Sequence, residues 1–214
     1  MKIKHIVWDW NGTLLNDNWL AITAINTLLK RYNLPLITLE QYLAVFTFPV
    51  IDYYKKLGFD FDKTPFSIVG TEFIDEYKSR MYKAKLQDGA LDTLKYFNKI
   101  GISQSLLSAA KQKMLDDLME YHKLEKYFYK VCGLTDHYAN SKIDAGISLI
   151  NDLDCLSNEV IMIGDTLHDA EVADEIGTQC ALIAHGHTTY ERLLESGENV
   201  FHNLFEFKEW FNKQ

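Results

Sequence analysis

The sequence predicts an α/β protein in which a parallel sheet carries helices on both faces and a helical segment interrupts the chain near its start. Two observations lead to this fold class. From about residue 86 onwards, short apolar strands alternate with helical segments, a pattern typical of parallel β-α-β units. Residues 38–84 show helical periodicity without a strand pattern. The simplest division is an α/β core of residues 1–15 and 86–214 with an inserted all-helical domain of residues 16–85.

The first predicted strand covers residues 3–9, whose apolar side chains are too dense for a strand with one solvent-facing side. Residues 19–32 follow as a helix, because apolar residues recur there at helical spacing. Further helices are expected in the insertion, and Thr64 and Pro65 stand where the N-cap and first turn of the last one belong. These helices cover residues 39–46, 49–58 and 64–84.

The rest of the chain alternates between the two element types. Helices are expected at residues 90–99, 110–122, 143–153 and 167–176, and a short one begins at Thr188 or Thr189. Strands are expected at residues 102–108, near 128–133, and at 159–165 and 178–184. This alternation predicts one parallel sheet with helices on both of its faces.

Composition and charge narrow the classes of function. Apolar residues make up 47% of the 214 residues and both charge signs are mixed throughout, which is typical of a globular protein with a full core. The net charge of −8 argues against a nucleic-acid partner, which requires a basic face. A small anionic substrate stays open, because a bound metal reverses the local field.

The chain also lacks the signals of a membrane or secreted protein. Its start has no apolar stretch long enough for a signal peptide, and no later run approaches a membrane span. The cysteines Cys132, Cys155 and Cys180 are odd in number and unrelated in spacing. We therefore expect free thiols and a cytoplasmic protein.

Three of the predicted strands end in polar residues, at the edge where ligands bind in open parallel sheets. Asp9, Ser108 and Asp165 occupy these positions, and Asp169 comes one helical turn after Asp165. Each residue alone has an ordinary explanation, since each is well placed to cap a turn or a helix. Their coincidence at one edge of one sheet predicts a functional site.

The chemistry of this cluster favours a metal. Asp9, Asp165 and Asp169 would repel one another, and burial would raise the pKa of each carboxyl. Mg²⁺ removes this difficulty, because it prefers carboxylates, water and substrate phosphate as ligands and orients a phosphoryl group. Backbone N–H groups in the turn after Asp9 can hold phosphoryl oxygens. Lys142 would add a positive charge, although a lysine at a helix start is also commonly solvated.

Four of these features, in their order along the chain, resemble the motifs of the haloacid dehalogenase superfamily. They are DWNGTL at residues 9–14, Ser108 at the end of a strand, Lys142, and GDTLHD at residues 164–169. The helical insertion between the first and second motifs resembles the small helical cap of the superfamily's phosphoglycolate phosphatases and β-phosphoglucomutases. The resemblance covers essentially the whole chain and implies a Rossmann-like core domain with an all-helical cap domain.

The resemblance implies a role for each matching residue. Asp9 would be the nucleophile and would form an aspartyl-phosphate intermediate, which divides one difficult step into two. Mg²⁺ would be held by Asp9, Asp165 and the backbone carbonyl of Asn11, and Asp169 would support the metal or its waters. The residues implied to contact the substrate's phosphoryl group are Gly12, Thr13, Ser108, Ala109 and Lys142. The function implied is that of a Mg²⁺-dependent phosphatase-like hydrolase acting on a small phosphorylated metabolite.

Asn11 departs from the pattern of these phosphatases, which usually carry an aspartate two residues after the nucleophile. That aspartate protonates the leaving oxygen and then activates water, whereas an amide does neither. General acid–base catalysis contributes roughly 10²–10⁴-fold, so the change matters most for a poor leaving group. The dehalogenases of the superfamily carry an aromatic residue at this position and act without a metal. This chain retains Asp165 and Asp169, which would be costly to bury without a cation, so phosphoryl transfer is favoured over dehalogenation.

Three hypotheses account for Asn11. Another side chain supplies the proton, the substrate has a leaving group that needs none, or the protein is a weak or inactive phosphatase that binds a phosphate or a partner. The candidates for a replacement acid are Asp17, His168, His185 and His187. The aromatic residues of the insertion are typical of a helical core rather than of a substrate pocket, and residues 47–50 are a candidate for a loop that reaches the site.

Overall fold

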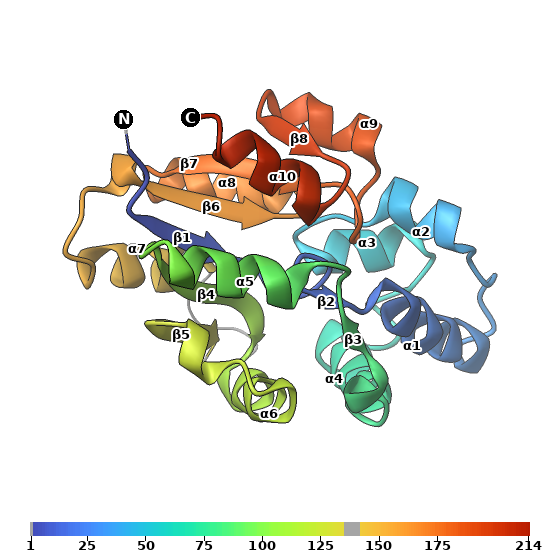
Figure 1. Ribbon diagram of the computed structural model, residues 1–214. Coiled ribbons are helices and arrows are strands. Elements are labelled where there is room, and N and C mark those ends of the chain that lie inside the picture. Colours follow the sequence, from blue (N-terminus) through green and yellow to red (C-terminus); the bar gives the residue numbers. More distant parts are fainter. Residues whose placement is uncertain (1, 135–141) are drawn as a thin grey trace.

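The computed structural model describes residues 2–134 and 142–214 (Figure 1). Within these residues six parallel strands form one sheet in the order β5-β4-β1-β6-β7-β8, which confirms the predicted fold class. The strands are β1 (His5–Trp8), β4 (Ser103–Lys111), β5 (Lys130–Leu134), β6 (Val160–Gly164), β7 (Gln179–Ile183) and β8 (Asn199–Phe201).

The strand β1 lies in the middle of the sheet, which explains why all four of its residues are buried. Alternate side chains of a strand point to opposite faces. Ile6 and Trp8 join the buried cluster on one face, and Val7 joins the cluster on the other. The first face is covered by α5 (Ala90–Lys99), α6 (Gln112–His122) and α10 (Leu204–Phe211), the second by α7 (Lys142–Asn151) and α8 (Leu167–Glu175).

The inserted helices gather on one side of the sheet and have a buried core of their own (Figure 1). They are α1 (Asn18–Arg31), α2 (Leu39–Val45), α3 (Val50–Lys56) and α4 (Phe66–Lys78). Tyr42, Tyr53 and Tyr54 belong to this core, as their helical spacing predicts. A short antiparallel ribbon of β2 (Leu15–Asn16) and β3 (Lys85–Leu86) carries the chain into and out of the insertion. The division at residues 16 and 85 stays a prediction.

The helix predicted at residues 64–84 is shorter in the structure. It begins after Pro65 without a side-chain cap and ends at Lys78, because the chain has to turn back towards β3. A short 3-10 turn, η1 (Met81–Lys83), occupies part of the remainder. Further 3-10 turns are η2 (Glu125–Tyr127), η3 (Ser157–Glu159) and η4 (Leu194–Ser196).

The C-terminal elements β8 and α10 were not predicted. The strand β8, which pairs with β7, is three residues long and therefore too short for an alternating pattern to be recognised. The short helix α9 (Tyr190–Leu193) begins after Thr189, whose hydroxyl accepts the Arg192 N–H, so the second of the two predicted caps is correct.

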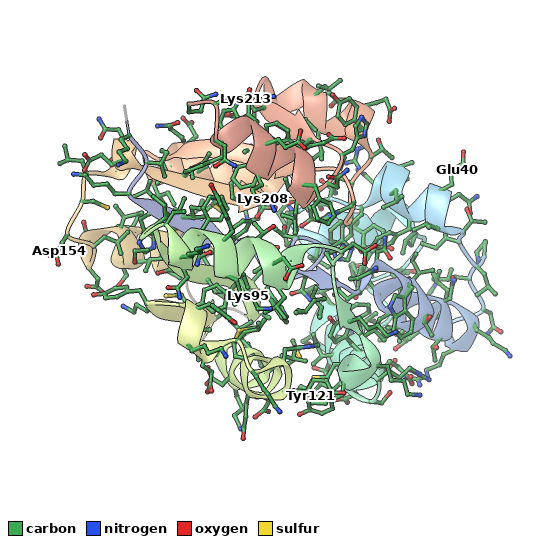
Figure 2. All side chains as sticks on the ribbon, in the orientation of Figure 1. Glu40, Lys95, Tyr121, Asp154, Lys208 and Lys213 are labelled. Atoms are coloured by element: carbon green, nitrogen blue, oxygen red, sulfur yellow. The ribbon has the colours of Figure 1, made fainter. Side chains whose placement is uncertain are left out.

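The surface of the molecule is charged and its interior is packed (Figure 2). The labelled side chains of Glu40 and Asp154 project away from the ribbon, while apolar side chains fill the space between sheet and helices. The three cysteines are free thiols, as predicted. Among the helices that the structure describes, none has the length and apolar character needed to cross a bilayer.

Candidate active site

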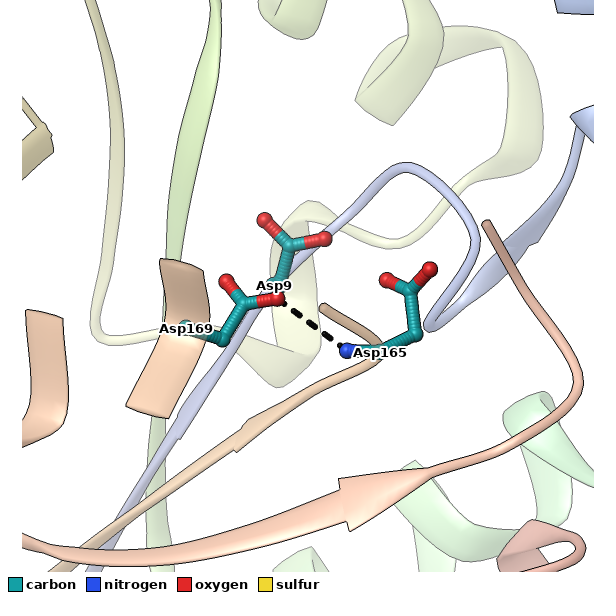
Figure 3. Close-up of side chains that lie close together, drawn as sticks. All are labelled: Asp9, Asp165 and Asp169. Carbon is teal, nitrogen blue, oxygen red and sulfur yellow. Dashed lines mark hydrogen bonds between the residues drawn. The ribbon is translucent and has the colours of Figure 1, made fainter. Parts of the chain in front are cut away.

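Three carboxylates meet at the carboxyl edge of the sheet (Figure 3). Asp9 directly follows β1, Asp165 directly follows β6, and Asp169 lies in the first turn of α8. All three are buried, and one oxygen of each lies within 4.8 Å of the others. The parallel topology causes this convergence, because β1 and β6 are neighbours and end at the same edge.

The donor set fits a hard divalent cation. Burial raises the pKa of Asp9 to about 8, with Lys142 opposing the shift and the other two carboxylates adding to it. Burial also raises the pKa of Asp165 to about 7, where the charge of His187 opposes the shift. Buried carboxylates that repel one another in this way are favourable ligands for a cation that takes oxygen donors.

Lys142 lies between two of the carboxylates. Its ammonium group donates to Oδ1 of Asp9 and to Oδ1 of Asp169, and all three side chains are almost fully buried. Burial alone would lower the pKa of Lys142, but the two carboxylates outweigh it and raise that pKa. The lysine is therefore charged and holds Asp9 in place.

Asp169 also fixes the start of α8. Its Oδ2 accepts the N–H groups of Asp165 (3.1 Å) and Thr166 (3.0 Å) and the Thr166 hydroxyl (2.7 Å). The first of these bonds is drawn in Figure 3. Burial would raise the pKa of Asp169, but Lys142 and Thr166 keep it below its usual value. Asp169 thus connects the lysine to the backbone that presents Asp165.

The turn after Asp9 packs closely against Asp165. Gly12 has a φ of 77°, and a Cβ added there would lie 2.2 Å from Oδ2 of Asp165, so this position requires glycine. The Thr13 hydroxyl donates to Oδ1 of Asp165 over 2.8 Å. The Gly12 N–H already donates to the Leu15 carbonyl (3.0 Å) and to Oδ1 of Asp17 (2.8 Å). In this arrangement it is not available to a phosphoryl oxygen, which must find its donors elsewhere.

Ser108 and Ala109 lie on β4, which continues to Lys111, beyond the predicted end at residue 108. The register pairs Trp8 with Leu106, so Ser108 lies at the same edge of the sheet as Asp9. Ser108 is buried and its hydroxyl accepts the Ala110 N–H over 3.1 Å, whereas Ala109 is exposed.

The amide of Asn11 is fully engaged with the insertion. Its Nδ2 donates to Oδ2 of Asp17 over 2.7 Å and to the Tyr77 hydroxyl over 2.9 Å. The Tyr77 hydroxyl in turn donates to the same Asp17 oxygen over 2.6 Å. Asp17 precedes α1 without capping it and turns inward, and Tyr77 comes from α4. Nothing in the sequence indicated Tyr77, because its partner lies 66 residues away.

Comparison with known proteins agrees with this geometry. The family of haloacid dehalogenase-like hydrolases matches residues 6–183. The chain belongs to this family. This confirms the resemblance carried by the four motifs. Asp9, Asp165 and Asp169 form a buried acidic cluster in this hydrolase.

Individual relatives of this hydrolase cover most of its length. Pyrophosphatase PpaX from Listeria monocytogenes is 30% identical over 199 residues, which cover 86% of this chain and 84% of that protein. A phosphoglycolate phosphatase from Aliivibrio fischeri is 22% identical, covering 96% of this chain and 94% of its own. A solved haloacid dehalogenase-like family protein from Streptococcus pneumoniae has the same fold, with a TM-score of 0.84 at 22% identity over 98% of both chains.

Of the candidate replacement acids, His187 and Asp17 form a buried pair. Nε2 of His187 lies 3.3 Å from Oδ1 of Asp17, and its Nδ1 lies 2.8 Å from the Tyr42 hydroxyl. Burial alone would lower the pKa of His187, but Asp17 outweighs it and raises that pKa to about 9. Burial likewise opposes ionisation of Asp17, and the His187 charge holds the pKa of Asp17 below its usual value. Both groups are therefore charged and paired with each other.

The other two candidate histidines, His185 and His168, make different contacts. His185 is neutral, since burial lowers its pKa to about 4, and its Nε2 lies 3.0 Å from the Thr13 carbonyl oxygen. His168 stacks on Phe48 with ring centres 4.6 Å apart and pairs with Glu171. The loop at residues 47–50 therefore reaches the core beside the start of α8.

A second set of contacts holds α2 of the insertion to the core. Nη1 and Nη2 of Arg192 donate to the carbonyl oxygens of Leu43 (2.7 Å) and Phe46 (2.9 Å) at the end of that helix. The Phe46 ring also packs against His187. Contacts that fasten the insertion to the core thus include those of Asn11 with Asp17 and Tyr77, those of His187 with Asp17 and Tyr42, and those of Arg192.

Proposed function

We propose that this hydrolase is a Mg²⁺-dependent phosphatase that acts through Asp9 on a small phosphorylated compound whose leaving group departs without needing a proton. The observation that carries the proposal is the buried Lys142 between Asp9 and Asp169, with Asp165 beside them. A carboxyl nucleophile, a fixed cation and a donor set for a divalent metal are the parts that phosphoryl transfer requires. The pyrophosphatase and phosphoglycolate phosphatase relatives support the same reaction class.

In this mechanism Asp9, Asp165 and the Asn11 carbonyl would hold the ion, and Asp169 would support it. The ion neutralises charge on the phosphoryl group when it is bound. A carboxylate oxygen of Asp9 attacks phosphorus, the bond to the leaving oxygen breaks, and an aspartyl phosphate forms. Lys142 opposes the rise in the pKa of Asp9 and, with Ser108, would hold phosphoryl oxygens. Water then attacks the phosphorus of the aspartyl phosphate, which releases orthophosphate and restores the Asp9 carboxylate.

Asn11 sets the kind of substrate. Its amide neither gives nor takes a proton at ordinary pH, and its NH₂ group already donates to Asp17 and Tyr77. A sugar or nucleoside alkoxide leaves slowly without an acid, whereas pyrophosphate and acyl phosphates release anions that are stable at neutral pH. We therefore rank pyrophosphate and acyl phosphates above phosphomonoesters as substrates.

The test is phosphate release from pyrophosphate, acetyl phosphate, p-nitrophenyl phosphate, phosphoglycolate and sugar and nucleoside monophosphates. Each is measured with Mg²⁺ and with EDTA, and Asp9→Asn serves as the blank. Metal-dependent release that Asp9→Asn abolishes, fastest on the first two compounds, is the expected result. Release no faster than that blank on every compound would overturn the proposal and leave a phosphate- or partner-binding protein.

A further inference from the structure

The loop after β7, at residues 185–187, closes over one carboxylate of the candidate active site. The N–H of His187 donates to Oδ2 of Asp165 over 2.6 Å. Gly186 makes this approach possible, since a Cβ added there would lie 2.1 Å from the same oxygen. Gly12, in the turn after β1, lies against that oxygen as well. Asp165 is therefore held between the turns that follow β1 and β7.

The imidazole of His187 reaches the turn after β1 through Asp17. Its Nε2 lies 3.3 Å from Oδ1 of Asp17, which also accepts the Gly12 N–H over 2.8 Å. The other oxygen of Asp17 accepts Nδ2 of Asn11 over 2.7 Å. His187 is 4% exposed and Asp17 is 1% exposed, so water does little to screen these contacts. The two ends of His187 thus connect Asp165 to the turn that carries Asn11, whose carbonyl is another proposed metal ligand.

His187 carries a positive charge in this environment. Burial lowers its pKa, but Asp17 first, and then Asp165 and Asp9, outweigh burial and raise that pKa to about 9. Both ring nitrogens are then donors, and Nδ1 donates to the Tyr42 hydroxyl over 2.8 Å. Burial raises the pKa of Asp165, and the charge of His187 opposes that rise. The imidazolium therefore acts directly on a carboxylate of the acidic cluster.

The buried charges of the site match a divalent cation. Among the residues that the structure describes, the site has four buried carboxyl groups and two buried bases, which are Asp9, Asp17, Asp165, Asp169, Lys142 and His187. Metal ligands bind in their deprotonated form, so the ionised cluster has an excess of two negative charges, which one Mg²⁺ balances. Without His187 the excess would be three, and the attraction for a cation would be stronger.

We infer that His187 is a positioning residue of the metal centre, in which its N–H orients Asp165 and its imidazolium weakens the attraction of the carboxylates for Mg²⁺. The inference rests on the proposed function, because it takes Asp165 and the Asn11 carbonyl as ligands. It uses the charge of His187 and no proton transfer, so it is separate from the role of a replacement acid. A permanent positive charge holds the carboxylates together when no ion is bound, and it lets the ion leave more readily because like charges repel strongly in a buried site.

The test is a calorimetric titration with Mg²⁺ at pH 7, where His187 is charged. The variants are His187→Gln, His187→Asn and the double variant His187→Gln/Asp17→Asn. Glutamine and asparagine keep an N–H donor and carry no charge. In the single variants Asp17 still accepts the Gly12 N–H and the Tyr77 hydroxyl, which keep it ionised.

We expect each single variant to bind Mg²⁺ about 10-fold more tightly, because a positive charge beside the ion is removed. The double variant also loses a negative charge, so its dissociation constant should return to within about 3-fold of that of the unaltered protein. A role in structure alone predicts the opposite for the single variants, since a carboxylate of Asp165 that is less well held binds the ion more weakly.

Two controls change neighbouring contacts without changing the charge. Tyr42→Phe removes the partner of Nδ1 of His187, and His185→Gln replaces a neutral histidine of the same loop. Both should leave the dissociation constant of Mg²⁺ unchanged. Urea unfolding establishes which variants are folded. If the single variants are not, Asp17→Asn is compared with the double variant, which should bind Mg²⁺ more tightly because it lacks the charge of His187.

The outcomes separate this inference from the proposed function. An unchanged or weaker Mg²⁺ affinity in folded His187→Gln and His187→Asn would overturn the inference and leave the proposed function standing. Equally tight binding by the double and the single variants would also overturn it, because the net charge would then not be the cause. If the unaltered protein binds no Mg²⁺, the metal centre itself is wrong, and the proposed function fails together with the inference.

Discussion

From the hydrogen bonds around Asn11 we predict that restoring the missing acid alone, in Asn11→Asp, makes the protein less stable. In Asn11→Asp the amide that donates to Asp17 and Tyr77 is replaced by a carboxylate that donates to neither. The new carboxylate would stand against Asp17, which is 1% exposed. A variant that looks like a return to the family pattern thus introduces a buried pair of like charges.

The size of this effect follows from the geometry. Two unit charges about 4 Å apart repel by about 4 kcal/mol at an effective dielectric constant of about 20. The loss of a hydrogen bond to a charged group adds about 1.5–3 kcal/mol, and uptake of a proton by the pair limits the total. We expect the free energy of unfolding to fall by about 2–4 kcal/mol at mildly alkaline pH.

The pH dependence has a defined sign. The shared proton raises the pKa of this carboxyl pair in the folded variant above its value in the unfolded chain. The folded state then binds more protons, so the stability of Asn11→Asp should recover as the pH falls through the raised pKa. The unaltered protein lacks this recovery at these positions.

The exchange variant Asn11→Asp/Asp17→Asn provides the matched control. It keeps one acid and one amide in the pair, so it should be more stable than the sum of the two single variants by about 2 kcal/mol or more. With an acid at position 11 and no opposing charge, its turnover of phosphomonoesters relative to pyrophosphate should rise about 10²-fold. Urea unfolding of all four proteins at acidic and alkaline pH, with phosphate release in parallel, measures both effects. An Asn11→Asp protein as stable as the unaltered one at alkaline pH would refute this reasoning.

Three further predictions concern other parts of the molecule. Arg192→Gln loses its bonds to two carbonyl oxygens of the insertion and should lower the free energy of unfolding by about 1–3 kcal/mol, and an unchanged urea midpoint would count against the role given to this contact. Burial lowers the pKa of His5 to about 4, so its neutral form stabilises the fold fully above about pH 6.5, and this contribution is lost as the pH falls towards 4. The loss of stability on acidification should therefore be about 2 kcal/mol smaller in His5→Gln, and equal losses in both proteins would disprove it. Mg²⁺ should raise the melting temperature of the unaltered protein and not that of Asp165→Asn, and the same rise in both would show that Asp165 is not a ligand.

The parts of the site that the sequence predicts are those that topology brings together. Asp9 and Asp165 end neighbouring parallel strands, and Asp169 follows one helical turn later, so their meeting depends only on the sheet and one helix start. Lys142 was proposed from the sequence as the positive charge of this cluster, and the structure places its ammonium between Asp9 and Asp169. Local patterns and strand order are sufficient for this cluster.

The contacts between insertion and core could not be predicted from the sequence. Tyr77 and Arg192 act across the two parts of the chain, and their partners depend on how the helices α2 and α4 dock. Thr189 was one of the two predicted caps of α9, and such a cap can be predicted because the acceptor and the N–H lie three residues apart. The helix α10 has a similar local signal, since Asn203 accepts the N–H groups of residues 205 and 206. It was not predicted, because the strand before it is only three residues long and gives no recognisable pattern.

The central claim is that Asp9 becomes phosphorylated. The most direct measurement is to quench the protein during turnover of pyrophosphate with Mg²⁺, reduce it with borohydride, and locate the product by peptide mass spectrometry. Borohydride converts an aspartyl phosphate into homoserine and leaves free aspartate unchanged. We predict homoserine at position 9 only when substrate and Mg²⁺ are both present. Phosphate release without homoserine at position 9, or with homoserine at another aspartate, would contradict the account.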